Sequence, residues 1–140
     1  MRAAFVRRMT PDELKARTKR FAVDVIRFYR GVPRTDEGRV IGNQLLRAGT
    51  AVGAHYRAVC RARSDAEFIA RLGGAIEEAD ESGYWLELLV EGELKPKAAV
   101  ATLWRESDEL TRIFVASRET ARRRVRARRE NQKSKIKNQK

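Results

Sequence analysis

The tetrapeptide Ser64-Asp65-Ala66-Glu67 constrains the fold of this 140-residue chain more than any other stretch. A serine followed three residues later by a glutamate is a capping box, which marks the first turn of a helix. The residues before it already follow a helical pattern up to about Arg63, so one helix must end where the next begins. Two long helices joined by so short a connection must lie antiparallel. The sequence therefore predicts an α-helical hairpin.

Apolar residues recur at intervals of three and four in four separate runs, which is the period of helices that bury one face. Thr10-Pro11-Asp12-Glu13 is a second helix-start signal and opens the first run, while Gly31 and Pro33 close it. No run shows the sustained alternation of a β-strand. In chain order, the predicted inward positions are Leu14, Thr18, Phe21, Ala22, Val25, Phe28 and Tyr29; Ile41, Leu45, Ala48, Val52, Tyr56 and Val59; Phe68, Leu72, Ala75, Ile76, Ala79, Leu86 and Leu89; and Val100, Leu103, Leu110 and Phe114.

These patterns predict an all-α protein, an up-down-up-down four-helix bundle with a basic C-terminal extension. We expect an N-terminal extension over residues 1–9, the bundle over 10–117, and an Arg/Lys-rich tail over 118–140, helical or disordered, called the basic tail below. The basic tail holds 11 of the 31 Lys and Arg residues but only two of the 19 Asp and Glu residues, and so carries +9 of the formal net charge of +12. Residues 131–140 repeat Asn-Gln-Lys and are expected to be disordered.

The composition excludes several classes of protein. Cys60 is the only cysteine, so no intrachain disulfide can form, and the His and Cys spacings of zinc sites are absent. The N-terminal stretch MRAAFVRRM lacks the apolar core of a signal peptide, and no run approaches the ~20 apolar residues that span a membrane. We therefore expect a cytoplasmic protein with no metal, no cofactor and no membrane association.

The stretch RAGTAVGAHYR, from Arg47 to Arg57, contains two glycines and the only histidine of the chain. It does not match the glycine patterns of phosphate-binding loops, and no strand precedes it. HEPN-type ribonucleases are also four-helix bundles and carry an Arg followed by a His after four to six residues, whereas seven residues separate Arg47 from His55. We therefore expect no enzymatic activity, and we interpret the small residues as a surface for close helix packing.

Because the helices before and after Ser64 are expected to run antiparallel, residues the same number of positions before and after Ser64 should lie opposite each other. This count places Ala54 opposite Gly74, His55 opposite Gly73, and Arg47 opposite Glu81. The cluster Glu77-Glu78-Asp80-Glu81 is then expected to supply a buried inter-helix partner for an arginine rather than a catalytic pair. The predicted structural pair consists of Arg47 with Glu81 and Glu78.

Two stretches, QLLRAGTAVGAHYRAVCRARSDAEFIARL and EEADESGYWLELL, carry a resemblance to a known family. From about Leu14 to Phe114 the chain resembles the four-helix bundle proteins encoded within intervening sequences of bacterial 23S ribosomal RNA genes. The resemblance implies a small helical bundle without an assigned enzymatic activity that assembles as a homo-oligomer, typically a pentamer. It also points, at the level of fold alone, to a pentameric accessory protein of reverse transcriptases. The chain departs from the family at His55, where Asn is usual, and at Ala58, where an acidic residue is common.

The first functional hypothesis is that an oligomeric, non-enzymatic bundle binds nucleic acid, RNA in the first place, through the basic tail. Lys and Arg side chains neutralise phosphates, and the sequence shows no device for reading bases, so we expect sequence-tolerant binding to RNA or DNA. The predicted nucleic-acid-binding residues are Arg118, Arg122, Arg123, Arg124, Arg126, Arg128, Arg129, Lys133, Lys135 and Lys137.

The alternative hypothesis is a protein–protein adaptor, for example an accessory subunit of a reverse transcriptase or ribonucleoprotein, in which the basic tail is incidental. Large apolar residues beside the main stripes widen the apolar surface beyond the needs of a monomeric bundle. The candidate interface residues for self-association or a protein partner are Tyr84, Trp85, Trp104 and Val115.

Overall fold

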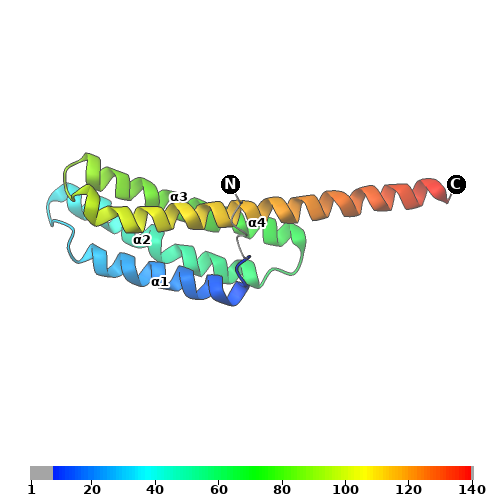
Figure 1. Ribbon diagram of the computed structural model, residues 1–140, viewed down its shortest axis with the longest axis horizontal. Helices are drawn as coiled ribbons and strands as arrows, with labels where there is room; N and C mark the ends of the chain where they lie inside the picture. Colours follow the sequence, from blue (N-terminus) through cyan, green and yellow to red (C-terminus); the bar gives the residue numbers. More distant parts are fainter. Residues whose placement is uncertain (1–7, 140) are drawn as a thin grey trace, which may run out of the picture.

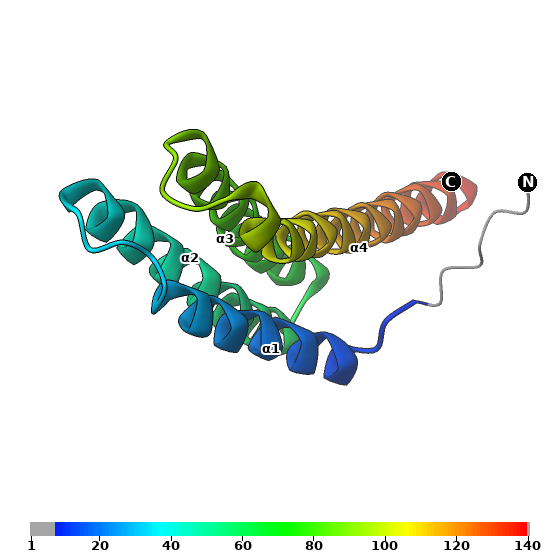
Figure 2. The same ribbon diagram turned by 60° about the vertical axis from the view of Figure 1, so that its left-hand side comes forward.

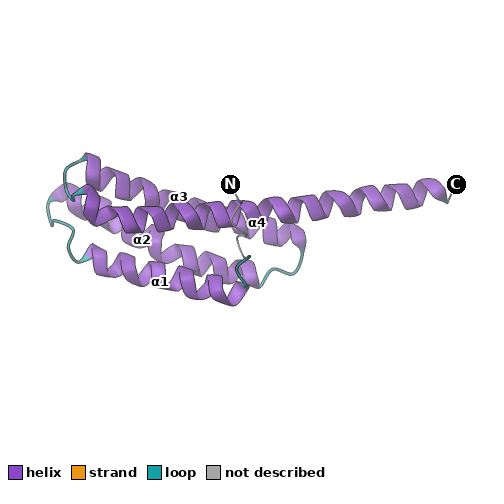
Figure 3. Ribbon diagram, viewed as in Figure 1, coloured by secondary structure: helices purple, strands orange, loops and turns teal. Residues whose placement is uncertain are grey.

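The computed structural model describes residues 8–139 and consists of four α-helices (Figures 1 and 3). Helix α1 spans Pro11–Tyr29, α2 spans Asp36–Cys60, α3 spans Asp65–Glu91 and α4 spans Lys97–Asn138. Every regular element in this part of the chain is a helix, so the prediction of an all-α four-helix bundle is confirmed. Most of the expected N-terminal extension, residues 1–7, lies outside the described residues, as does residue 140.

Side-chain caps begin the first three helices. Thr10 Oγ1 and Ser64 Oγ each accept a hydrogen bond at 3.1 Å from the backbone N–H three residues on. At the second site Glu67 Oε2 also accepts the backbone N–H of Arg63, the residue before the N-cap, at 3.1 Å. Thr35 caps α2 in the same way. These caps satisfy N–H groups that have no partner inside a helix, and so they fix where each helix begins.

The helices follow one another around the bundle in chain order (Figure 2). Helix α2 packs against α1 and α3, and α3 packs against α4, while α1 and α4 make the smallest contact between neighbours. The core between them is built from the predicted apolar stripes, including Phe21, Leu45 and Leu86, which are almost fully buried. Tyr56 stacks on Phe114 with ring centroids 5.6 Å apart, and its burial raises the pKa of the phenol.

Gly49 and Gly53 of α2 face α1, and this corrects the expected small-on-small contact with α3. A Cβ at Gly49 would lie 2.8 Å from the side chain of Val25. The contact of His55 on α3 is also one residue later than counted, because a Cβ at Gly74 would lie 2.6 Å from His55 Nδ1, whereas Gly73 has nothing within 4 Å. His55 therefore faces Gly74, not Gly73. The side chain of a helical residue leans toward the N-terminus of its helix, so it meets a residue that a count of heights along the backbone does not place opposite it.

Helix α4 is longer than its apolar stripe. Ala121 is fully buried, so packing continues past Phe114 by two turns. The helix then runs to Asn138 without a break, whereas residues 131–140 were expected to be disordered. The physical reason is local: no Gly or Pro occurs after Pro96, and the last residues are mostly Arg, Lys, Ala, Gln and Glu, which favour helix.

Candidate nucleic-acid interface

The basic tail continues α4 beyond the bundle. Apart from the half-buried Val125, every described residue from 122 onward is exposed. Residues 122–138 extend the helix by about 25 Å, at 1.5 Å per residue. In Figure 1 this orange-to-red segment projects past the other three helices. Its cationic side chains are therefore held on a helical frame with solvent around most of it.

Two of the ten predicted binding residues lie where the tail leaves the bundle. Arg118 is half-buried, and its Nε is enclosed without a hydrogen-bond partner among the described residues. Arg122 Nη1 donates to Glu119 Oε1 at 2.9 Å. This hydrogen bond is the main cause of the lowered pKa of Glu119, so the carboxylate stays ionised and offsets the charge of Arg122.

Two further arginines of the tail contact the bundle. Arg128 Nη1 donates to Asp65 Oδ2 at 2.5 Å, and Arg124 Nη2 lies 3.5 Å from Asp65 Oδ1. Asp65 is the first residue of α3, so these contacts join the tail to the α2–α3 corner. In the sequence, Asp65 is recognisable only as part of a capping box. Nothing there indicates this pairing, because 63 positions separate the aspartate from Arg128.

The remaining six predicted residues form no hydrogen bond or ion pair with any other side chain that the structure describes. They are Arg123, Arg126, Arg129, Lys133, Lys135 and Lys137. Several share a face with Arg122, because positions 122, 126, 129, 133 and 137 are spaced by three and four residues. The tail therefore presents a continuous cationic stripe along its length.

The structure brings together the predicted group around Arg47. Its guanidinium pairs with Glu81 and lies 3.3 Å from Glu78 Oε2, and the same Glu78 is 3.9 Å from His55 Nε2. Hydrogen bonding to Glu81 is the largest cause of the raised pKa of Arg47. The side chain of Arg47 is 51% exposed, so the expected buried pair is in fact a surface pair. It joins α2 to α3 but encloses no reactive centre.

The four candidate interface residues are not equally exposed. Tyr84 is 53% exposed and Trp104 is 37% exposed, whereas Trp85 and Val115 are half-buried. Trp85 Nε1 donates to Glu81 Oε1 at 3.1 Å, and its ring lies 5.0 Å from that of Tyr84. Trp104 lies over Gly83, where a Cβ would be 3.8 Å from the indole Nε1. The two exposed rings therefore come from α3 and α4.

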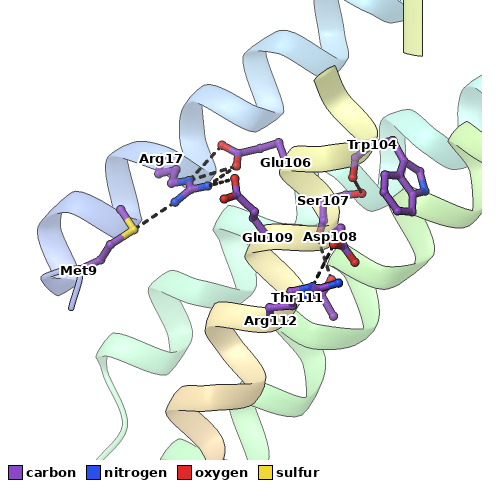
Figure 4. A network of polar contacts seen from close by, with 9 residues as sticks. All are labelled: Met9, Arg17, Trp104, Glu106, Ser107, Asp108, Glu109, Thr111 and Arg112. Atoms are coloured by element: carbon purple, nitrogen blue, oxygen red, sulfur yellow. Dashed lines mark hydrogen bonds and ion pairs between the residues drawn. The ribbon is translucent and has the colours of Figure 1, made fainter. Parts of the chain in front are cut away.

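A polar network that no sequence pattern indicated joins α1 to α4 (Figure 4). Arg17 donates from Nε to both carboxylate oxygens of Glu106, at 3.1 and 3.0 Å, and from Nη2 to Glu109 at 2.8 Å. Its Nη1 also contacts the sulfur of Met9 at 3.3 Å. Helices α1 and α4, which make the smallest packing contact, are therefore linked by ion pairs.

The part of the chain described by the structure contains no group of three or more His, Cys, Asp or Glu residues that could hold a metal ion. No helix within residues 8–139 is long and apolar enough to cross a membrane. Two surface hollows, one at the α1–α2 turn and one at the α2–α3 corner, lie away from His55.

Fold and site together define a small α-helical bundle that carries a cationic helical extension. The chain belongs to the 23S rRNA-intervening sequence protein family, whose model matches residues 13–116. It is also similar to a crystal structure of a protein with unknown function from the S23 ribosomal protein family of Bacteroides thetaiotaomicron. The two share 31% identity with a TM-score of 0.71, over 79% of this chain and 99% of the other. No curated protein matches the sequence. The family match ends before the basic tail.

Proposed function

We propose that the protein is a non-enzymatic, oligomeric bundle that binds nucleic acid through the basic tail. The observation that carries the proposal is the set of six cationic side chains on the exposed part of α4 that have no acidic partner among the described residues. An unpaired cation releases counterions when it binds a phosphate, whereas a cation paired with a carboxylate must first give up that partner. RNA is the first ligand to test, because the family is described by its association with 23S rRNA genes.

The binding is expected to be tolerant of sequence. The exposed tail presents Arg and Lys side chains and no aromatic ring on which a base could stack. Contacts from such side chains go to phosphates, which position a protein on a duplex without reading its bases. Several tails in one oligomer would raise the avidity for a long nucleic acid without any new contact.

The test compares three full-length proteins on the same RNA and DNA duplexes across a salt series. The first is the unaltered chain. In the second, six tail residues are changed to Gln, namely Arg123, Arg126, Arg129, Lys133, Lys135 and Lys137. In the matched control, six exposed residues of the bundle are changed to Gln, namely Lys19, Arg20, Arg27, Arg30, Arg34 and Arg105. Both variants lose the same formal charge, and Gln preserves helix propensity.

We expect the tail variant to bind more weakly and its log-log salt slope to flatten by about 0.9 for each duplex phosphate that the protein no longer neutralises. The bundle variant should keep a slope close to that of the unaltered chain. Equal losses of affinity in the two variants would show that only net charge matters, and would overturn the assignment to the tail.

An adaptor role for protein partners is the second candidate, and the exposed rings of Tyr84 and Trp104 favour it. Exposed aromatic residues are enriched in protein interfaces. The same three proteins distinguish the candidates, because an adaptor with an incidental tail predicts weak and equal nucleic-acid binding by all of them.

A further inference from the structure

Beyond Ala121, two arginines of the tail reach back to the corner between α2 and α3. Arg124 and Arg128 approach Asp65 there from α4. The aspartate side chain is 22% exposed, and each of its oxygens faces a different guanidinium. Beyond this point the tail stands clear of the other helices (Figure 1). The corner therefore links the bundle to the exposed part of the tail.

A hollow of about 330 Å³ lies at this corner. Its lining includes Arg63 from the α2–α3 turn together with Arg124 and Arg128 from α4. Arg63 donates its backbone N–H to Glu67, but its guanidinium has no partner among the described residues. Two guanidinium groups of α4 thus face the carboxylate of Asp65, and Arg63 from the turn also lines the hollow, so the charged residues of the lining carry a net positive charge.

The chemistry of this arrangement suits a phosphate. A guanidinium donates two parallel hydrogen bonds to a carboxylate or to a phosphate with nearly the same geometry. Ion pairs that remain partly exposed to water contribute little to stability, so an incoming anion can displace the carboxylate. Arg124, Arg128 and Lys135 share a face of α4, because they are spaced by four and seven residues, and this face lies opposite the cationic stripe. A nucleic acid seated in the hollow would therefore continue outward along the face of Lys135.

We infer that the corner is a binding site for one phosphodiester group, held by Arg63, Arg124 and Arg128, and that Asp65 occupies the anion position while the site is empty. The inference rests on the proposed function and deepens it. In this arrangement one end of the bound nucleic acid lies against the bundle, and the rest runs outward along the tail. It also assigns Asp65 the role of a built-in competitor for the phosphate.

The test uses Asp65→Asn in the full-length chain. This change removes the competing charge and frees the arginines, so we expect tighter duplex binding and a salt slope steeper by about 0.9 for each guanidinium that gains a phosphate. The same change is placed in two further backgrounds. One lacks the arginines of the hollow, Arg124→Gln with Arg128→Gln, and the other lacks a matched pair outside it, Arg126→Gln with Arg129→Gln.

In the first background Asp65→Asn should leave the salt slope unchanged, whereas in the second it should steepen the slope as fully as in the unaltered chain. Asp108→Asn, which removes a carboxylate of α4 that pairs with Arg112 on the same helix, controls for net charge and should have little effect. Melting curves confirm that each variant is folded, and Asp65→Ser serves as a second variant.

Four results would overturn the inference. An equal effect of Asp65→Asn in all three backgrounds would reduce it to a change of net charge. Weaker binding by Asp65→Asn alone would show that the carboxylate holds the arginines in place and does not compete with phosphate. An unaltered chain that binds duplexes without responding to Asp65→Asn would refute the corner site and leave the proposed function standing, whereas absence of any binding by the unaltered chain would refute both.

Discussion

Glycines of this bundle occupy two opposite environments, which shows how strongly neighbours decide the role of one residue type. Gly49 lies under Val25, which leaves no room for a methyl group, while Gly73 faces open space. A helical glycine costs stability through the freedom that the unfolded chain loses. At Gly49 the cost is offset by the close approach of α1 and α2. At Gly73 the structure shows no contact that offsets it.

We therefore predict opposite effects for two alanine substitutions. Gly49→Ala should lower the free energy of unfolding by about 1–3 kcal/mol, because the new methyl group overlaps a buried valine. Gly73→Ala should raise it by about 0.5–1 kcal/mol, because alanine restricts the unfolded chain and meets nothing in the folded one. Urea denaturation followed by circular dichroism measures both. Destabilisation by both substitutions would contradict the open space beside Gly73 on α3.

At the scale of helices, the contact between α1 and α4 differs from the others in kind. The remaining neighbours are joined mainly by apolar packing, whereas this pair is joined by the guanidinium of Arg17 and two carboxylates of α4 (Figure 4). The side chains of Arg17 and Glu106 are 22% and 26% exposed, so water screens them only in part. Hydrogen bonding to Glu106 is the main cause of the raised pKa of Arg17.

Two arginines in this region make a matched test. Arg17→Ala should lower the free energy of unfolding by about 1–2 kcal/mol, because it leaves a half-buried carboxylate without its donor. Arg112→Ala removes a 78%-exposed arginine that pairs with Asp108 within α4, and should cost less than about 0.5 kcal/mol. Thermal melts at low and high salt would measure the difference. Similar small losses for both variants would show that α1 is held by packing alone.

For the whole molecule, the proposed oligomer determines how many basic tails act together. Tyr84 is 53% exposed on α3, and Val40 on α2 is 63% exposed, so both are apolar side chains that water reaches easily. Tyr84 belongs to the candidate interface, together with Trp104 of α4, whereas Val40 does not. The two residues therefore allow the interface to be tested without disturbing the core.

We predict that light scattering at micromolar concentration reports a mass several times 16.0 kDa for the unaltered chain. Tyr84→Arg should shift the mass toward the monomer, because a buried unpaired charge is costly in an interface. Val40→Arg should leave the mass unchanged. A monomeric unaltered chain would contradict the proposed assembly, and loss of mass in the Val40 variant alone would place the interface on α2.

The sequence by itself determined the bundle, because its signals act over short distances. The caps at Thr10 and Ser64, the spacing of apolar residues, and Gly31 with Pro33 each involve residues within a few positions of one another. They set where helices begin and end, and short connections then leave antiparallel packing as the compact arrangement. The charge of the basic tail is likewise a property of composition.

Only the tertiary structure decided which distant side chains meet. The contacts of Asp65 with Arg124 and Arg128, of Arg17 with Glu106, and of Gly49 with Val25 join residues on different helices. A shift of one residue along a helix turns a side chain by about 100°, so a count of heights that pairs Arg47 with Glu81 can still misplace His55 by one residue. Patterns within one helix do not specify which residue of a neighbouring helix lies opposite, because that depends on how the packed helices fit together.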